Sequence, residues 1–116
     1  MQAKITAIGA KAINHEEPLL IFFNDSATQL LKEYAIIQEF TQSEFVELDR
    51  EDNIYFWDQE YTITSVGSKV LKELEELGHV SFFFGTPPKE ELINAITLKE
   101  AQLPQLSVGM TITYKK

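Results

Sequence analysis

The sequence predicts a mainly β fold: a small β-barrel or sandwich of short strands with two short helices, at about residues 26–34 and 68–77. Most ordered segments are short, rich in β-branched or aromatic residues, and bounded by Gly, Pro, Asn or Asp. Only two segments carry helix signals, which leaves the strands to form the core. No linker, repeat or change of composition divides the chain, so residues 1–116 are expected to fold as a single domain.

In the first half of the chain, strands are expected over three ranges: 3–8, 19–23 and 34–40. Residues 19–23 form a continuous apolar run, which is typical of a strand buried on both faces. A helix is expected to follow, because Ser26 is a typical N-cap residue and Gln29 completes a capping box with it. Leu30 and Leu31 are then expected on the buried side of this helix.

In the second half, strands at 54–57 and 61–66 flank residues 58–60, which are typical of a hairpin connection. Ser68 is expected to cap the second helix, and Gly78 to end it, because glycine adopts the left-handed conformation without a Cβ penalty. Four apolar residues at helical spacing form the expected buried face: Val70, Leu71, Leu74 and Leu77.

Three further strands are expected over 79–84, 95–98 and 110–114. In the first of them, Val80, Phe82 and Phe84 alternate with Ser81 and Phe83. Alternation with a period of two favours a strand with one buried face.

Composition excludes several classes of function. Eighteen acidic residues against ten Lys and Arg give a net charge of −8, and Arg50 is the only arginine, which argues against nucleic acid and against an anionic membrane surface. No cysteine is present, so disulfides and thiolate chemistry are excluded. The apolar runs are too short to insert into a membrane, and the first residues lack a signal-peptide core, so a cytoplasmic location is expected. No cofactor and no metal are expected.

The two histidines are the side chains that titrate near neutrality without help. His15 lies in a polar stretch between two expected strands, where a solvated loop residue is the simplest interpretation. His79 directly follows the glycine that ends the second helix. At that position a histidine often meets the helix dipole or bonds a terminal carbonyl, although a functional role stays open.

The acidic stretch between residues 44 and 60 invites comparison with a calcium loop. Asp49, Glu51, Asn53 and Glu60 fall at positions 1, 3, 5 and 12 of such a loop. However, Ile54 stands where the loop requires glycine, and residues 54–57 are expected to form a strand. We therefore interpret the stretch as a solvated acidic turn.

Two runs resemble a known family. Residues 61–67, Tyr-Thr-Ile-Thr-Ser-Val-Gly, and residues 74–81, Leu-Glu-Glu-Leu-Gly-His-Val-Ser, are similar to the signature of the glucitol/sorbitol-specific IIA component of the bacterial phosphotransferase system. Residues 5–12 and 31–34 also resemble segments of that family. The resemblance implies a phosphoryl carrier that accepts phosphate on a histidine from the phosphocarrier protein. It implies transfer onward to the IIB/IIC sugar permease components.

The resemblance also identifies where this sequence departs from the family. The phosphoryl-accepting histidine of the family corresponds to Gln38, and an amide nitrogen is not a nucleophile. The Pro-Gly-Thr segment of the family is replaced by residues 93–95, Ile-Asn-Ala, and its usual helical asparagine is Glu73.

Three functions follow from this comparison. The first is a working phosphocarrier, for which His79 is the candidate acceptor in place of Gln38. The second is a non-phosphorylated homologue that binds phosphotransferase partners or a regulator, with Gln38 holding the site uncharged. The third is a reuse of the fold for an unrelated binding task.

Overall fold

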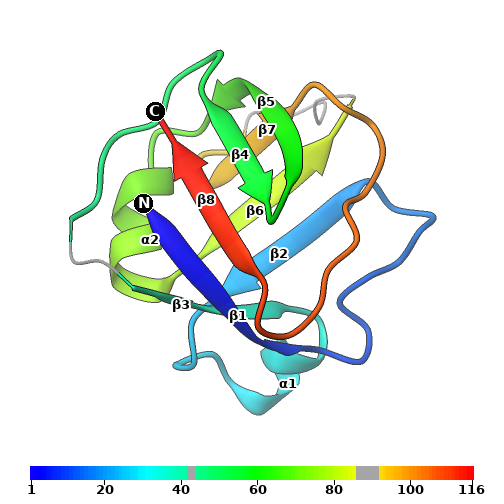
Figure 1. Ribbon diagram of the computed structural model, residues 1–116. Helices are drawn as coiled ribbons and strands as arrows, with labels where there is room; N and C mark the ends of the chain where they lie inside the picture. Colours follow the sequence, from blue (N-terminus) through cyan, green and yellow to red (C-terminus); the bar gives the residue numbers. More distant parts are fainter. Residues whose placement is uncertain (42–43, 86–91) are drawn as a thin grey trace.

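A computed structural model describes residues 1–41, 44–85 and 92–116 of the chain (Figure 1). Within these ranges the elements are, in chain order, β1 (Gln2–Ile8), β2 (Leu19–Phe23), α1 (Gln29–Glu33), β3 (Ile36–Phe40), β4 (Asn53–Phe56), β5 (Gln59–Val66), α2 (Val70–Leu77), β6 (Val80–Phe84), β7 (Ala95–Leu98) and β8 (Thr111–Lys115).

The strands close into a barrel with the order β1-β3-β2-β6-β7-β5-β4-β8. The pairs β2–β3 and β6–β7 are parallel, and the other six pairs are antiparallel. The mainly β class is thus confirmed, and of the two architectures the sequence left open the chain forms the barrel. Closure removes the unpaired edges that an open sheet would expose to other chains.

In most strands alternate residues fill the barrel, whereas consecutive residues are buried in β3 and β7. In β6, Val80, Phe82 and Phe84 are buried and the two residues between them are half-buried, as the alternation predicts. In β2, only Leu20 and Phe22 are fully buried, so the prediction of burial on both faces is wrong. Neighbouring strands, rather than helices, flank β2, and its outer face is covered only in part. Each fully buried large side chain stabilises the fold by about 1.5–3 kcal/mol.

The first helix is shorter than expected, and its cap was predicted wrongly. Thr28, not Ser26, is the N-cap residue, because its Oγ1 accepts the Leu31 N–H at 3.2 Å. The Ser26 N–H and hydroxyl instead donate to Asn24 Oδ1, so Ser26 is held in a local turn before the helix. Leu30 is 71% exposed and Leu31 half-buried, because a helix of five residues packs little of its surface on the barrel.

The second helix ends as predicted but begins differently. Gly78 adopts the left-handed conformation at φ 59°, which confirms it as the terminating residue. The helix starts after Lys69, and no side chain caps it; Ser68 does not act as a cap. The Lys69 N–H is instead satisfied by the Ile93 carbonyl at 2.7 Å. Of the expected apolar face, Val70 and Leu74 are buried, Leu71 is half-buried and Leu77 is 38% exposed.

The hairpin between β4 and β5 is confirmed, with a tighter connection than the sequence suggested. Phe56 pairs with Gln59, so Trp57 and Asp58 alone form the turn. Trp57 has φ 62°, a left-handed conformation in which a bulky side chain is strained.

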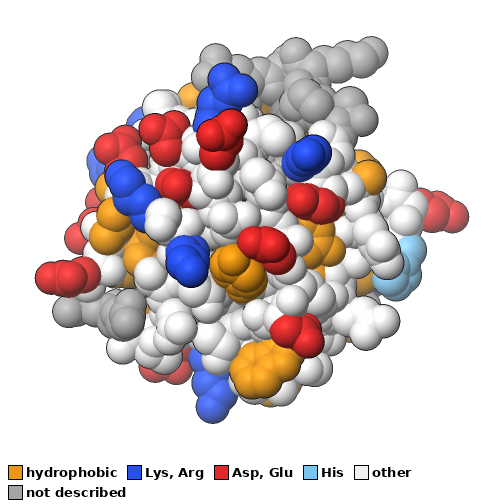
Figure 2. All heavy atoms as spheres, turned by 45° about the horizontal axis from the view of Figure 1, so that its top comes forward, with side chains coloured by type: hydrophobic (Ala, Val, Ile, Leu, Met, Phe, Trp, Pro, Cys, Tyr) orange, Lys and Arg blue, Asp and Glu red, His pale blue; other side chains and the backbone are white. Residues whose placement is uncertain are grey.

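The surface carries charges of both signs. On the face shown in Figure 2, acidic and basic side chains are interspersed, and no continuous basic patch forms there among the described residues. Within the described ranges, neither helix is long and apolar enough to cross a membrane.

Candidate functional site

The candidate site lies where β2 ends and where β6 and β7 begin. Two segments approach each other closely there, at Gly78, which ends α2, and at Asn24, which follows β2. The Gly78 N–H donates to the carbonyls of Glu73 and Leu74. A Cβ at this position would come within 2.8 Å of the Asn24 Cβ, so the close approach of the two segments requires glycine. The Asn24 N–H donates to the Leu77 carbonyl at 2.8 Å, which ties the end of β2 to the end of α2.

His79 is held in this junction with its ring almost fully covered. Its exposure is 6%, and its ring stacks on Phe23 with centroids 4.1 Å apart and planes 16° apart. Nδ1 lies 3.0 Å from the Phe22 carbonyl oxygen, and Nε2 lies 3.1 Å from the Asn94 amide nitrogen. The sequence suggested a contact with the dipole or a carbonyl of the preceding helix. The ring bonds a strand carbonyl instead, and only the backbone N–H of His79 donates to the helix, at Glu73 O.

The partners of His79 define its tautomer. A carbonyl oxygen only accepts, so Nδ1 must carry the proton. Nε2 then accepts from the Asn94 amide, which donates. The neutral ring has both nitrogens engaged in this arrangement, and its Nε2 lone pair is directed at Asn94. The Glu73 carboxylate is also near, with Oε1 at 4.0 Å from Nε2.

Gln38 lies on β3 and points into the barrel together with Ile36; both are fully buried. Its Nε2 donates to the Gly78 carbonyl at 2.9 Å, and its Oε1 accepts from the Tyr114 hydroxyl at 2.7 Å. Burial raises the pKa of Tyr114, so this hydroxyl keeps its proton and donates at any physiological pH. Gln38 therefore joins β3 and β8 to the residue that precedes His79.

The three positions at which the resemblance implies departures from the family meet at this one place. Gln38 bonds the carbonyl of Gly78, Asn94 bonds the ring of His79, and Glu73 lies 4.0 Å from the same ring. These positions are far apart in the sequence, so their convergence is decided by the tertiary structure. Together they surround the Gly-His pair of the motif with hydrogen-bonding groups.

A shallow hollow of about 480 Å³ opens beside Gln38 on the outer surface. Its lining is polar and includes two carboxylates, Asp25 and Glu39. The nearby cation, Lys32, is paired with Asp25 at 3.1 Å. The carboxylates of this lining disfavour the approach of an anionic group.

The remaining candidates lie elsewhere. His15 is exposed in the loop between β1 and β2, at the other end of β2 from His79. Asn53 and Glu60 of the calcium-like spacing lie on β4 and β5, where they pair with Thr62 and Tyr55. Within the described ranges no three His, Cys, Asp or Glu side chains are grouped so as to hold a metal ion.

Sequence reasoning placed Gln38 and His79 in the site but did not predict that they are joined through Gly78. It also did not identify Asn94 and Tyr114 as partners. Asn94 carried a signal, because the resemblance implies a departure from the family at residues 93–95. Tyr114 carried none, since an aromatic residue in an alternating strand is equally typical of a plain core.

The chain is thus a small β-domain: a closed barrel of eight short strands with a Gly-His junction at the end of its second helix. The chain belongs to the family described as PTS system glucitol/sorbitol-specific IIA component, whose sequence pattern matches residues 1–113. Among solved structures it is similar to a PTS system IIA component from Enterococcus faecalis V583, with 37% identity over the whole of both chains and a TM-score of 0.93. A comparison with curated protein sequences finds no match.

Proposed function

We propose that this chain is a docking or regulatory IIA component of a glucitol/sorbitol-type phosphotransferase system that does not itself carry phosphate. The observation behind the proposal is the convergence of Gln38, Glu73 and Asn94 on the Gly78–His79 pair. A site that had lost only its acceptor would leave the other family residues in place. Here the surroundings have changed with the acceptor, which favours a rebuilt site over a damaged one.

The chemistry of phosphoryl transfer supports this choice. An acceptor needs a free lone pair that can approach phosphorus in line, and room for the three equatorial oxygens. His79 is 6% exposed, and both of its ring nitrogens are engaged by Phe22 and Asn94. Gln38 is fully buried and offers an amide whose nitrogen has no available lone pair.

The proposed role follows from the charge of the site. A phosphohistidine switches a carrier between two states that differ by about two negative charges. The amide of Gln38 is neutral, so the chain would present its partners with one constant state. We propose that those partners are the phosphocarrier protein and the IIB/IIC permease components. We further propose that docking takes place in the cytoplasm, with no nucleic acid contact and no membrane insertion.

The deciding experiment measures phosphorylation and binding separately. The chain is incubated with phosphoenolpyruvate, enzyme I and the phosphocarrier protein, and its intact mass is measured under mildly alkaline conditions that preserve phosphohistidine. We expect no gain of a phosphoryl group. We also expect binding to the phosphocarrier protein or to the IIB component in isothermal titration calorimetry. A mass gain that His79→Asn abolishes and His15→Asn retains would establish a relay through His79 and refute the proposal.

A second test replaces residues 38, 73 and 94 with the residues that the resemblance implies for the family. A histidine at position 38 restores the residue that the resemblance implies as the phosphoryl acceptor. Gln38→His alone tests whether one residue blocks acceptance. The variant that combines Gln38→His, Glu73→Asn and Asn94→Gly tests the surroundings as well. If only the combined variant gains a phosphoryl group, the site was rebuilt as a unit, as we propose.

A further inference from the structure

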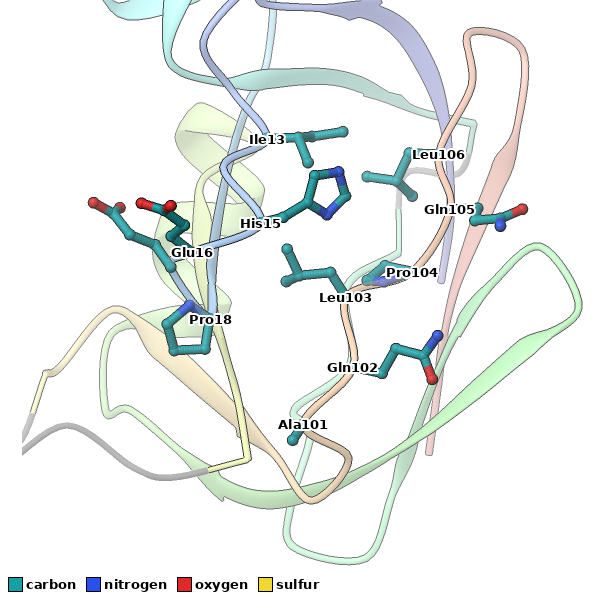
Figure 3. Close-up of a pocket in the computed structure, with 11 residues that line it drawn as sticks. Ile13, His15, Glu16, Pro18, Ala101, Gln102, Leu103, Pro104, Gln105 and Leu106 are labelled. Atoms are coloured by element: carbon teal, nitrogen blue, oxygen red, sulfur yellow. The ribbon is translucent and has the colours of Figure 1, made fainter.

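A groove of about 620 Å³ lies beside the start of β2 and the end of β6, on the side of the barrel remote from His79. One wall is the loop between β1 and β2, and the other is the loop between β7 and β8 (Figure 3). In Figure 1 both loops are seen on the side of the barrel opposite α2.

The floor of the groove is apolar and contains the exposed histidine. Figure 3 shows the ring of His15 among the side chains of Ile13, Leu103 and Leu106. These three aliphatic residues are only half-buried, and their inner sides pack on the barrel core. Their outer sides are therefore available to a binding partner.

The walls are held by hydrogen bonds. The Gln59 side chain binds the backbone of Gln105 twice, through Nε2 to the carbonyl at 2.9 Å and through Oε1 from the N–H at 2.8 Å. The Tyr61 hydroxyl donates to the Gln102 carbonyl at 2.6 Å, and on the other wall the Phe84 N–H donates to the Pro18 carbonyl at 2.9 Å. A preformed groove binds a partner without the entropy cost of ordering loops.

Trp57 lies in the turn between β4 and β5, two residues before Gln59, the glutamine that holds one wall of the groove. Its side chain is 63% exposed, and its backbone has φ 62°, held by an N–H bond to the Thr111 carbonyl at 2.9 Å. Strained backbone conformations cluster at functional sites, and tryptophan is enriched among the residues that dominate binding energy at interfaces. The turn therefore carries an exposed aromatic anchor at a position better suited to Gly or Asn.

The charge around the groove selects the partner. Its described lining includes two carboxylates, Glu16 and Glu17, and no Lys or Arg. Asp58 adjoins Trp57, and the whole chain has a net charge of −8. A second copy of this chain would bring like charges together, whereas a basic segment would be attracted.

We propose that this groove and Trp57 form the docking surface for a partner protein that presents Lys or Arg beside an apolar side chain. The apolar side chain occupies the space among Ile13, Leu103 and Leu106, and the cation pairs with Glu16 or Glu17. The inference rests on the proposed docking function and places docking at the end of the barrel remote from Gln38 and His79.

The test maps where a partner binds. The ¹⁵N-labelled chain is titrated with unlabelled phosphocarrier protein and, in a separate experiment, with the IIB component. Trp57 is the only tryptophan, so its indole N–H gives a single resolved reporter. We expect the largest chemical-shift changes at this indole and at the groove amides, and weaker binding as the salt concentration rises.

Matched variants separate docking from folding. Trp57→Asn is expected to raise Kd by about tenfold or more without lowering the unfolding midpoint, because Asn tolerates the left-handed conformation. Glu17→Lys is expected to raise Kd and to reduce its salt dependence. Leu30→Ser removes an equally exposed apolar side chain from α1, and Glu76→Lys reverses an exposed charge on α2; both are expected to leave Kd unchanged.

Each other outcome is decisive. In one, binding changes chemical shifts only at the end of the barrel that contains Gln38 and His79, with an unchanged Kd for Trp57→Asn. That result would refute the docking surface and leave the proposed function standing. Binding by neither component would refute both. Chemical-shift changes at the groove amides that grow with the concentration of the chain in the absence of any partner would assign the groove to a second copy. They would refute the proposal of a basic partner.

Discussion

The two histidines lie near opposite ends of β2 and differ in burial and in hydrogen bonding. His79 is 6% exposed, stacked on Phe23 and bonded at both ring nitrogens. His15 is exposed in a loop and lies in an open groove among aliphatic side chains. The buried end has its polar groups paired within the chain, so it contributes to stability. The open end leaves apolar and acidic groups available, so it is suited to recognition.

The comparison shows that a family motif need not mark the accessible surface. The Gly-His junction carries the most specific resemblance, yet its imidazole is enclosed by Phe23, the Phe22 carbonyl and the Asn94 amide. The groove carries no motif, yet its walls are held by hydrogen bonds and its described lining includes two carboxylates and no Lys or Arg. Stability variants can test this division directly.

The largest effect is expected from Gln38→Met. An apolar side chain of similar length would leave the Gly78 carbonyl and the Tyr114 hydroxyl without partners. Each unpaired buried group costs about 1–3 kcal/mol, so the free energy of unfolding should fall by roughly 2–6 kcal/mol in urea denaturation. Gln38→His, which keeps one donor and one acceptor, serves as the control and should lose clearly less. Equal losses would mean that the two hydrogen bonds contribute little.

A smaller effect is expected from His79→Phe. This change keeps an aromatic ring against Phe23 but removes the donor to the Phe22 carbonyl and the acceptor for Asn94. We expect a loss of about 1–3 kcal/mol. The matched change at the open end, His15→Phe, should stay within about 0.5 kcal/mol, because no buried polar group loses a partner. A comparable loss at both positions would remove the distinction between the two ends.

The smallest effect near neutral pH concerns Tyr114 and becomes visible in alkali. Burial raises the pKa of Tyr114 above its usual 10.0, so the folded chain keeps the phenolic proton where the unfolded chain releases it. The stability contributed by this group is fully present below pH 10 and falls as the pH rises, by up to about 1.4 kcal/mol per pH unit. In Tyr114→Phe this proton is absent. The free energy of unfolding, measured in urea at several pH values, should therefore fall less steeply as the pH rises above 10. An unchanged slope would show that the hydroxyl reaches solvent.

Much of the fold was predictable because it depends on local patterns. Alternation in β6, the turn signals around the strands and the glycine after α2 each have a cause within a few residues. The errors arose where two local options competed. Ser26 and Thr28 are both good caps, and a hydrogen bond to Asn24 already engages Ser26. Ser68 was displaced because a distant carbonyl, that of Ile93, satisfies the start of α2.

The sequence by itself determined a mainly β domain of short strands with two short helices, its resemblance to the IIA family, and a glutamine at position 38. The spatial result was decided by the tertiary structure: Gln38, Glu73 and Asn94 meet at the Gly78–His79 pair, and a groove opens at the opposite end of the same strands. The reason is physical. Periodicity and turn chemistry act between near neighbours, whereas these contacts join strands that become adjacent only when the barrel closes.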